Sequence, residues 1–130
     1  MAISTIPAYQ QRAVVTSDSV GNTSVAKNTA KTLITFTLPA GRCIVICSVR
    51  FSNATSTGSR QACYTTTQDS VASHTVGRWA AQPATGDDLT YLNWTNYENL
   101  ATDTTMYLNV YHTHSAALNV AAQFTVIKLD

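Results

Sequence analysis

The fold of this chain is decided by two stretches, TTMYLNVYHTH at residues 104–114 and LNVAAQFTVIKLD at residues 118–130. Apolar and polar side chains alternate along both of them, which is the pattern of a half-buried β-strand. The second stretch is also semi-apolar on its other face, which carries Ala121, Gln123, Thr125, Ile127 and Leu129. A strand that is apolar on both sides needs cover on both sides. One cover is the domain core, and the other is most simply a second copy of the protein.

Further strands are predicted through the rest of the chain, at residues 13–16, 32–38, 42–52, 60–68, 71–79 and 89–99. Turn-forming residues separate them, as in PAG at 39–41, and longer loops are expected at 53–59 and 80–88. No segment has helical periodicity. Many short strands with turns every ~8–12 residues predict an all-β fold, an antiparallel jelly-roll β-sandwich. We expect one domain over residues 1–130, with 1–28 as a less regular N-terminal arm.

The alternation also predicts the core of the sandwich. Eight apolar side chains are expected to fill it: Phe36, Val45, Phe51, Met106, Leu108, Val110, Phe124 and Val126. Cys43 and Cys47 lie four residues apart in one predicted strand, about 13 Å, which is too far for a disulfide. A bond from Cys63 to either of them stays open, but an odd number of cysteines favours free, buried thiols.

Composition excludes several classes of function. Eight basic residues against seven acidic ones leave a net charge of +1, so nothing steers the protein toward nucleic acid or an anionic membrane. Charged residues make up 12% of the chain, about half the usual share of ~25%, which leaves little to oppose self-association. No stretch approaches the ~20 apolar residues of a membrane span, and MAISTIPAYQQR at the start has no features of a secretory signal.

Two segments together are similar to a known family. FTLPAGRCIVICSVRF at 36–51, followed by TTMYLNVYHTHSAALNVAAQFTVIKL at 104–129, resembles the C1q/TNF-like jelly-roll head domains of bacteriophage fibres and related bacterial proteins. There are departures, since Arg42 and Cys43 stand where an aromatic residue is common, and HTH at 112–114 replaces a Gln-x-Ser pattern. The resemblance implies a homotrimer in the virion, with a binding or structural role. We therefore expect contacts with a host-surface glycan or protein and with other virion proteins.

Candidate contact residues follow from the strand faces and loops. The trimer interface is predicted on one face of 118–129 with two adjacent tyrosines, and comprises Tyr107, Tyr111, Ala121, Gln123, Thr125 and Ile127. Aromatic and acidic residues in and beside the 80–88 loop are the candidates for ligand binding: Trp79, Asp87, Asp88, Tyr91 and Tyr97. Packing in the core or at an interface is the alternative for each aromatic residue.

No catalytic pattern is present. GxSxG, HExxH and phosphate-binding Gly-rich motifs are all missing from the sequence, so we expect neither an enzyme nor a cofactor. His112 and His114 share one side of a strand and are a weak candidate for a metal site, which three copies around an axis would complete. The alternative is a polar strand end that reaches solvent.

The sequence thus predicts a trimeric attachment head of a phage fibre or similar virion appendage. Two alternatives remain open. One is a ligand-free module for trimerisation or capsid decoration, and the other is a cellular carbohydrate-binding lectin domain.

Overall fold

The computed structural model of the protein describes residues 14–52, 58–71, 79–83 and 89–130, with the backbone alone for Val14 and for 79–83. Within these ranges the chain forms eight strands: β1 (Val14–Val25), β2 (Lys31–Leu38), β3 (Gly41–Ser52), β4 (Ser59–Thr65), β5 (Trp79–Pro83), β6 (Thr90–Leu100), β7 (Thr104–His112) and β8 (Leu118–Lys128). No helix of membrane-spanning length and hydropathy occurs in these ranges.

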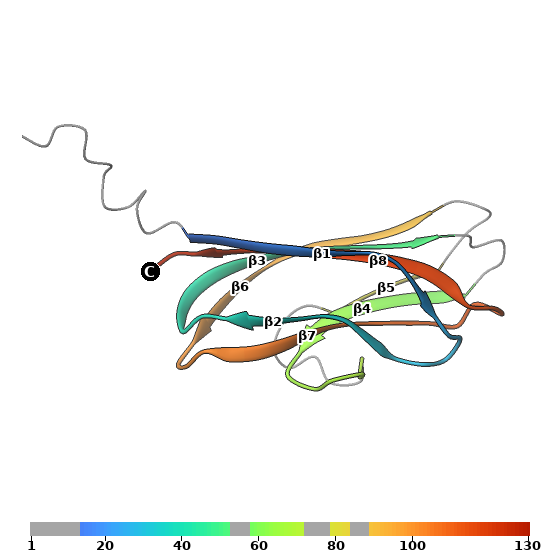
Figure 1. Cartoon of the computed structure of the whole chain (residues 1–130), viewed down its shortest axis with the longest axis horizontal. Helices are drawn as coiled ribbons and strands as arrows, with labels where there is room; N and C mark the ends of the chain where they lie inside the picture. Colours follow the sequence, from blue (N-terminus) through green and yellow to red (C-terminus); the bar gives the residue numbers. More distant parts are fainter. Residues whose placement is uncertain (1–13, 53–57, 72–78, 84–88) are drawn as a thin grey trace, which may run out of the picture.

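The strands form two antiparallel sheets that face each other (Figure 1). Sheet I has the order β1-β8-β3-β6, and sheet II has the order β2-β7-β4-β5. This is the strand order of a jelly roll, in which strands distant in sequence lie side by side. The predicted all-β sandwich is therefore confirmed.

The core lies between the two sheets and is built by period-2 alternation. In β3, the even-numbered side chains from Ile44 to Ser48 point outward and the odd-numbered ones, from Cys43 to Phe51, are buried. All eight side chains predicted for the core are buried. The ring of Phe124 in sheet I stacks on that of Phe36 in sheet II, with centroids 4.2 Å apart, so the two sheets meet through this pair.

The N-terminal part of the chain is more regular than the sequence predicts. Only 13–16 has the composition of a strand, yet β1 runs from Val14 to Val25 and pairs with β8, with one irregularity between Val20 and Thr23. Its side chains are mostly exposed, and it is one of the two edge strands of sheet I. Because β1 carries little apolar surface, its sequence predicts an irregular arm rather than a strand.

The segment after residue 70 also differs from the prediction. The sequence predicts a loop at 80–88, but β5 occupies Trp79–Pro83 and pairs with β4 as an edge strand of sheet II. Pro83 stands at the end of this edge strand, where a missing N–H is tolerated. Most of the predicted strand 71–79 lies outside the described residues. The predicted turn at 39–41 is confirmed: β2 ends at Leu38, and Gly41 has a positive φ of 92°.

The three cysteines are free thiols and all are buried. Cys43 and Cys47 belong to the core between the sheets. Cys63 shares the outer side of sheet II with Asn109, its register partner, and its Sγ lies 3.7 Å from the carbonyl oxygen of Ser70. A disulfide from Cys63 to either of the others is therefore excluded, because a whole sheet lies between them.

We expect the thiols to react with alkylating reagents only after unfolding. Burial raises the pKa of Cys47 to about 12 and that of Cys63 to about 11, and it also raises the pKa of Cys43. At neutral pH the nucleophilic thiolate is therefore scarce as well as inaccessible. Mass spectrometry after labelling should show no modified cysteine in the folded protein and three in denaturant. Rapid labelling of the folded protein would contradict this placement.

Candidate functional site

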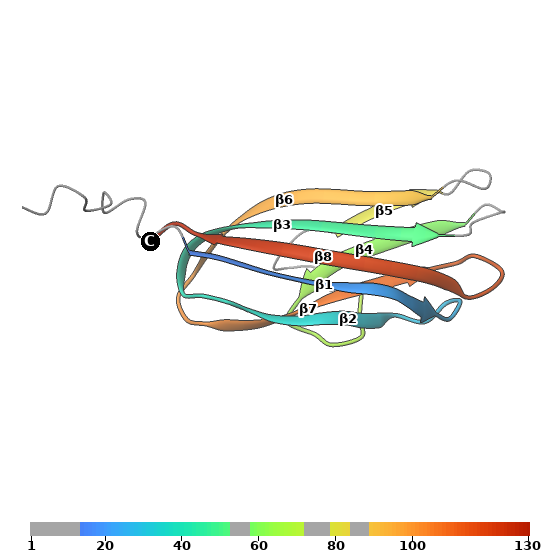
Figure 2. The same ribbon diagram turned by 45° about the horizontal axis from the view of Figure 1, so that its top comes forward.

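The outer face of sheet I is a continuous, exposed surface of the described residues. Figure 2 shows its four strands side by side in the order β6, β3, β8, β1. Register pairs join one side chain from each strand into a row across this face. One such row is apolar from edge to edge and consists of Val15, Ile127, Ile44 and Tyr97.

We call this row, together with Ile46 of the next row, the apolar band. Its two end residues are the most exposed, with 60% of Val15 and 56% of Tyr97 accessible, and Ile46 is 41% accessible. Ile44 and Ile127 are half-buried between them. The outer face of an antiparallel sheet is normally polar, and a contiguous apolar patch marks a surface that another molecule covers.

The predicted interface residues divide between the two sheets. The four on β8 share the outer face of sheet I as expected: Ala121, Gln123, Thr125 and Ile127. Ile127 belongs to the apolar band and Thr125 lies beside Ile46, whereas Ala121 and Gln123 lie farther along the strand. Tyr107 and Tyr111 are not adjacent to them, because β7 belongs to sheet II and these tyrosines lie on its outer side.

The outer side of sheet II is partly covered by the chain itself. Asn109, between the two tyrosines, is fully buried and its Nδ2 donates to the carbonyl oxygens of Thr67 and Ser70. Asp69 accepts a hydrogen bond from the backbone N–H of Thr32 and thereby holds the same segment against β2. Part of the outer side of sheet II is therefore unavailable to a partner.

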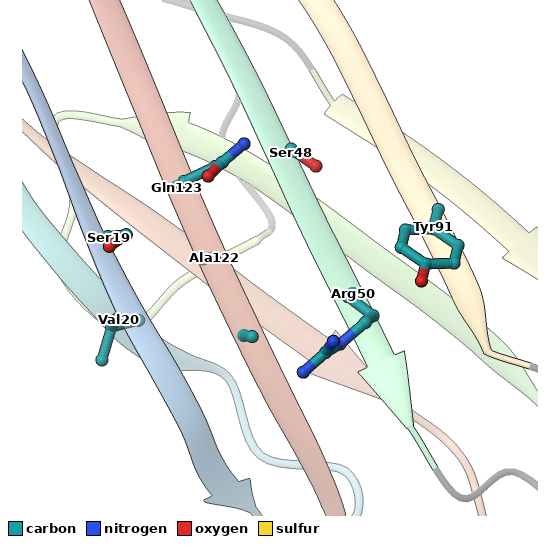
Figure 3. Close-up of a pocket in the computed structure, with 8 residues that line it drawn as sticks. Ser19, Val20, Ser48, Arg50, Tyr91, Ala122 and Gln123 are labelled. Carbon is teal, nitrogen blue, oxygen red and sulfur yellow. The ribbon is translucent and has the colours of Figure 1, made fainter.

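The opposite end of the outer face of sheet I carries a pocket of about 240 Å³. We call it the Arg50 pocket. It is lined by Ser19, Val20, Ser48, Arg50, Tyr91, Ala121, Ala122 and Gln123. Figure 3 shows the Arg50 side chain extending from β3 toward β8, with Tyr91 on the β6 side.

The guanidinium of Arg50 has few partners. Its Nη2 donates to Oδ1 of Asn22 at 2.9 Å, and its buried Nε has no hydrogen-bond partner. In the described ranges the one salt bridge joins Arg42 to Asp130, so no described carboxylate neutralises Arg50. A cation without an anion in a pocket is a candidate anion-binding group.

The predicted ligand-binding residues are only partly placed. Tyr91 lines the Arg50 pocket and is half-exposed, while Tyr97 belongs to the apolar band, six residues away along β6. The side chain of Trp79 lies outside the described residues, as do Asp87 and Asp88.

The histidine pair lies inside the protein, and the expectation of a polar strand end in solvent is wrong. His112 is fully buried and His114 is 4% exposed. Nδ1 of His112 accepts a hydrogen bond from the backbone N–H of His114 at 3.1 Å, so the proton belongs on Nε2, which donates to the carbonyl oxygen of Val25 at 2.7 Å. Both ring nitrogens of His112 are thus hydrogen-bonded within the chain. No cluster of three or more metal-ligating side chains occurs among the described residues.

A buried arginine lies beside the histidines, and no sequence pattern predicts its burial. Arg60 is the register partner of His112 and is fully buried, with Nη1 donating to the carbonyl oxygen of Gly58 at 3.0 Å. Burial lowers the pKa of His112, the hydrogen bond to Val25 opposes this, and the nearby positive charge of Arg60 lowers it further. His112 is therefore held in its neutral form.

One buried carboxyl group joins the two sheets. Oε1 of Glu98 accepts hydrogen bonds from the hydroxyl of Tyr64 at 3.2 Å and from Nδ2 of Asn96 at 2.6 Å. Burial raises the pKa of Glu98, and these two hydrogen bonds oppose the shift. The hydrogen bond from Tyr64 to Glu98 links β4 to β6. Neither of the two hydrogen-bond partners of Glu98 is acidic, so the arrangement contains no pair of carboxyl groups for acid–base chemistry.

The Arg50 pocket was missed by sequence reasoning. Alternation in 42–52 places Arg50 on the outer face, but its neighbours there come from β1, β6 and β8. The signal that was present is the basic residue Arg50 on the same strand face as Ile44 and Ile46. Recognising the pocket also required the strand pairing.

Comparison with known proteins identifies the fold and leaves the family open. No protein-family model matches the chain, and no curated protein matches its sequence. One similar structure is a chain from the crystal structure of the T13 IBDV viral particle, with a TM-score of 0.72 and 9% sequence identity over 91% of this chain and 31% of the viral one. Another is a chain of infectious bursal disease virus Gx strain, with a TM-score of 0.69 and 12% identity over 91% of this chain and 32% of the viral one.

This chain therefore spans about a third of the length of those viral chains. At such low identity the match shows a shared β-sandwich fold and does not single out the C1q/TNF-like type.

Proposed function

We propose, starting from this fold, that the chain is a virion structural module that assembles with copies of itself and contributes to host attachment, without catalytic activity. The observation that carries the proposal is the apolar band, which crosses all four strands of sheet I and is exposed in the single chain. Similarity to chains of a virus particle supports the virion context. The low content of charged residues also favours self-association, because few charges are present to repel a second copy.

The finer form of the proposal is a homotrimer that binds a host-surface glycan or protein, as in the head of a phage fibre. The sequence resemblance to C1q/TNF-like heads supports it, and three weak sites on one rigid head would bind by avidity. A capsid-building or capsid-decorating module is the second candidate, and the similarity to chains of an icosahedral virus favours it. Both candidates need the same contact between copies, which we centre on the apolar band with Thr125 beside it.

We expect native protein to have three times the 14.0 kDa chain mass in light scattering, and Ile127→Asp to reduce the mass to that of a monomer. Ile127 lies in the middle of the apolar band, so an assembled Ile127→Asp would desolvate one carboxylate per chain at the contact.

Thr105→Asp is the matched control. It adds the same charge at an exposed position on the outer side of sheet II and should leave the mass unchanged. Melting temperatures of both variants check that they are folded. A native monomer at all concentrations, or an Ile127→Asp variant that keeps the native mass, would contradict assembly through this face.

A further inference from the structure

We propose that the Arg50 pocket binds a sugar that carries a carboxylate group. The inference deepens the proposed attachment role and rests on it. It is carried by the pocket itself, by the guanidinium without an anionic partner, and by the aromatic ring at the pocket wall.

The charge of the pocket selects an anion. Arg50 is the one ionisable group among its lining side chains apart from the phenol of Tyr91. One hydrogen bond to Asn22 fixes the guanidinium, and its remaining Nη donors are available for the two oxygens of a carboxylate. A single fixed guanidinium suits a singly charged carboxylate, whereas a phosphate dianion is better matched by several cations.

The other lining groups select a small polyol. Ser19, Ser48 and Gln123 supply hydroxyl and amide groups, and Tyr91, 50% exposed, supplies an aromatic face with a polar tip. A volume of about 240 Å³ lies just below the usual range of ~300–1,000 Å³ for small-molecule sites, so it suits one sugar unit.

A peptide fits the same place less well. The floor of the pocket is formed by β8 and β3, and both of these strands are paired on both sides. Their backbone groups are committed to the sheet, whereas an extended peptide usually gains affinity by pairing with a free strand edge. The edge strands β1 and β6 contribute Ser19, Val20 and Tyr91 to the sides of the pocket, and side-chain contacts of this kind suit a compact ligand.

The pocket and the apolar band are neighbours on the same face. Ile46 of the band and Ser48 of the pocket are two residues apart along β3, about 7 Å, whereas Ile44 and Arg50 are six residues apart, about 20 Å. A neighbouring copy seated on the row of Ile44 and Ile127 therefore leaves the guanidinium of Arg50 open when its contact stops short of Ser48. Ala121 and Gln123, which the sequence assigns to the trimer interface, also line this pocket.

Ligand-observed and protein-observed NMR titrations test the inference. The probes are glucuronic acid and N-acetylneuraminic acid, with methyl glucoside as the neutral control and a short Asp/Glu peptide as the alternative anion. We expect an acidic sugar to bind with millimolar affinity and to shift signals of pocket residues, and methyl glucoside to bind at least tenfold more weakly.

Variants connect the binding to the pocket. Arg50→Gln and Ser48→Asp should each weaken binding of the acidic sugar at least tenfold, the first by removing the cation and the second by adding a repelling carboxylate. Arg42→Gln is the matched control, because Arg42 lies on the same face of the same strand and is already paired with Asp130. It should bind as the wild type does, and thermal melts show whether each variant is folded.

The two proposals fail separately. Three results would overturn the sugar site alone if light scattering shows intact assembly. They are no binding of either acidic sugar, equal binding of methyl glucoside, and unchanged binding by folded Arg50→Gln. Tighter binding of the acidic peptide than of the sugars would overturn the ligand class. A monomer that binds the acidic sugar through Arg50 would overturn the assembly and support the site.

Discussion

Replacing Phe124 with alanine should lower the free energy of unfolding by about 3–5 kcal/mol. Phe124 lies in the middle of β8, is 3% exposed, and stacks on Phe36 of the opposite sheet with ring centroids 4.2 Å apart. The substitution removes buried apolar surface and leaves a cavity, and the flanking strands β1 and β3 hold the backbone of β8 in place, so the cavity cannot collapse.

Denaturant-induced unfolding at a fixed protein concentration measures this loss. Gln123→Ala is the control, since Gln123 precedes Phe124 on the same strand and its side chain is exposed on the outer face. We expect its effect on stability to remain within about 0.5 kcal/mol. A loss below about 1 kcal/mol for Phe124→Ala would mean that the faces of β8 are reversed.

Acidification should destabilise the protein through His112. Its pKa in the folded state is lowered by burial, so below the ordinary value of 6.5 the unfolded chain binds a proton that the folded chain does not. The contribution of neutral His112 to stability is therefore fully present above pH 6.5 and is lost as the pH falls toward the lowered pKa. Protonation of Nδ1 would also break the hydrogen bond from the backbone N–H of His114 and place a second positive charge beside buried Arg60.

Removing the imidazole should have a large effect of its own. His112→Ala leaves the carbonyl oxygen of Val25 and the N–H of His114 without these hydrogen bonds, and we expect a loss of about 2–4 kcal/mol at pH 8. His112→Gln keeps a donor and an acceptor without a titrating group, so it should be less destabilised and should lose the His112 part of the pH dependence.

Urea unfolding of wild type and His112→Gln at pH 8 and pH 5.5 isolates this contribution. Glu98 acts in the opposite direction, because its raised pKa stabilises the fold in acid and that stability is lost as the pH rises through the folded pKa. Glu98 is present in both proteins, so its effect cancels in the difference between them. Equal pH dependence of wild type and His112→Gln would show that His112 does not titrate in this window.

The strands that the sequence predicts well are those that bury one apolar face. β3, β7 and β8 are paired on both sides, their alternation is strong, and seven of the eight predicted core residues lie on them. The edge strands β2 and β6 also alternate, and the prediction places each of their ends within one residue. β1 and β5 are the edge strands whose mixed composition resembles that of a loop. Alternation therefore gives the faces of a strand correctly and fails for edge strands without a regular apolar face.

The candidate site was harder to predict because it depends on which strands become neighbours. Thr125 and Ile127 were assigned to an outer face, and the structure places them there. Tyr107 and Tyr111 were expected beside them, but the chain crosses to the other sheet between β7 and β8. Burial of Arg60 and His112 was unpredictable for a similar reason, since charged residues are seldom fully buried and only the packed structure shows the exception.

The nesting of the strand pairs has a consequence for how fast the chain folds. β1 pairs with β8, β2 with β7, β3 with β6 and β4 with β5, so only the last of these pairs joins consecutive strands. Closing such long loops costs chain entropy before the contacts form, and folding should take milliseconds to seconds. During synthesis β1 emerges long before its partner β8, and sheet I stays incomplete until β8 has left the ribosome. Aggregation through unpaired strands is thus a particular hazard of the nascent chain.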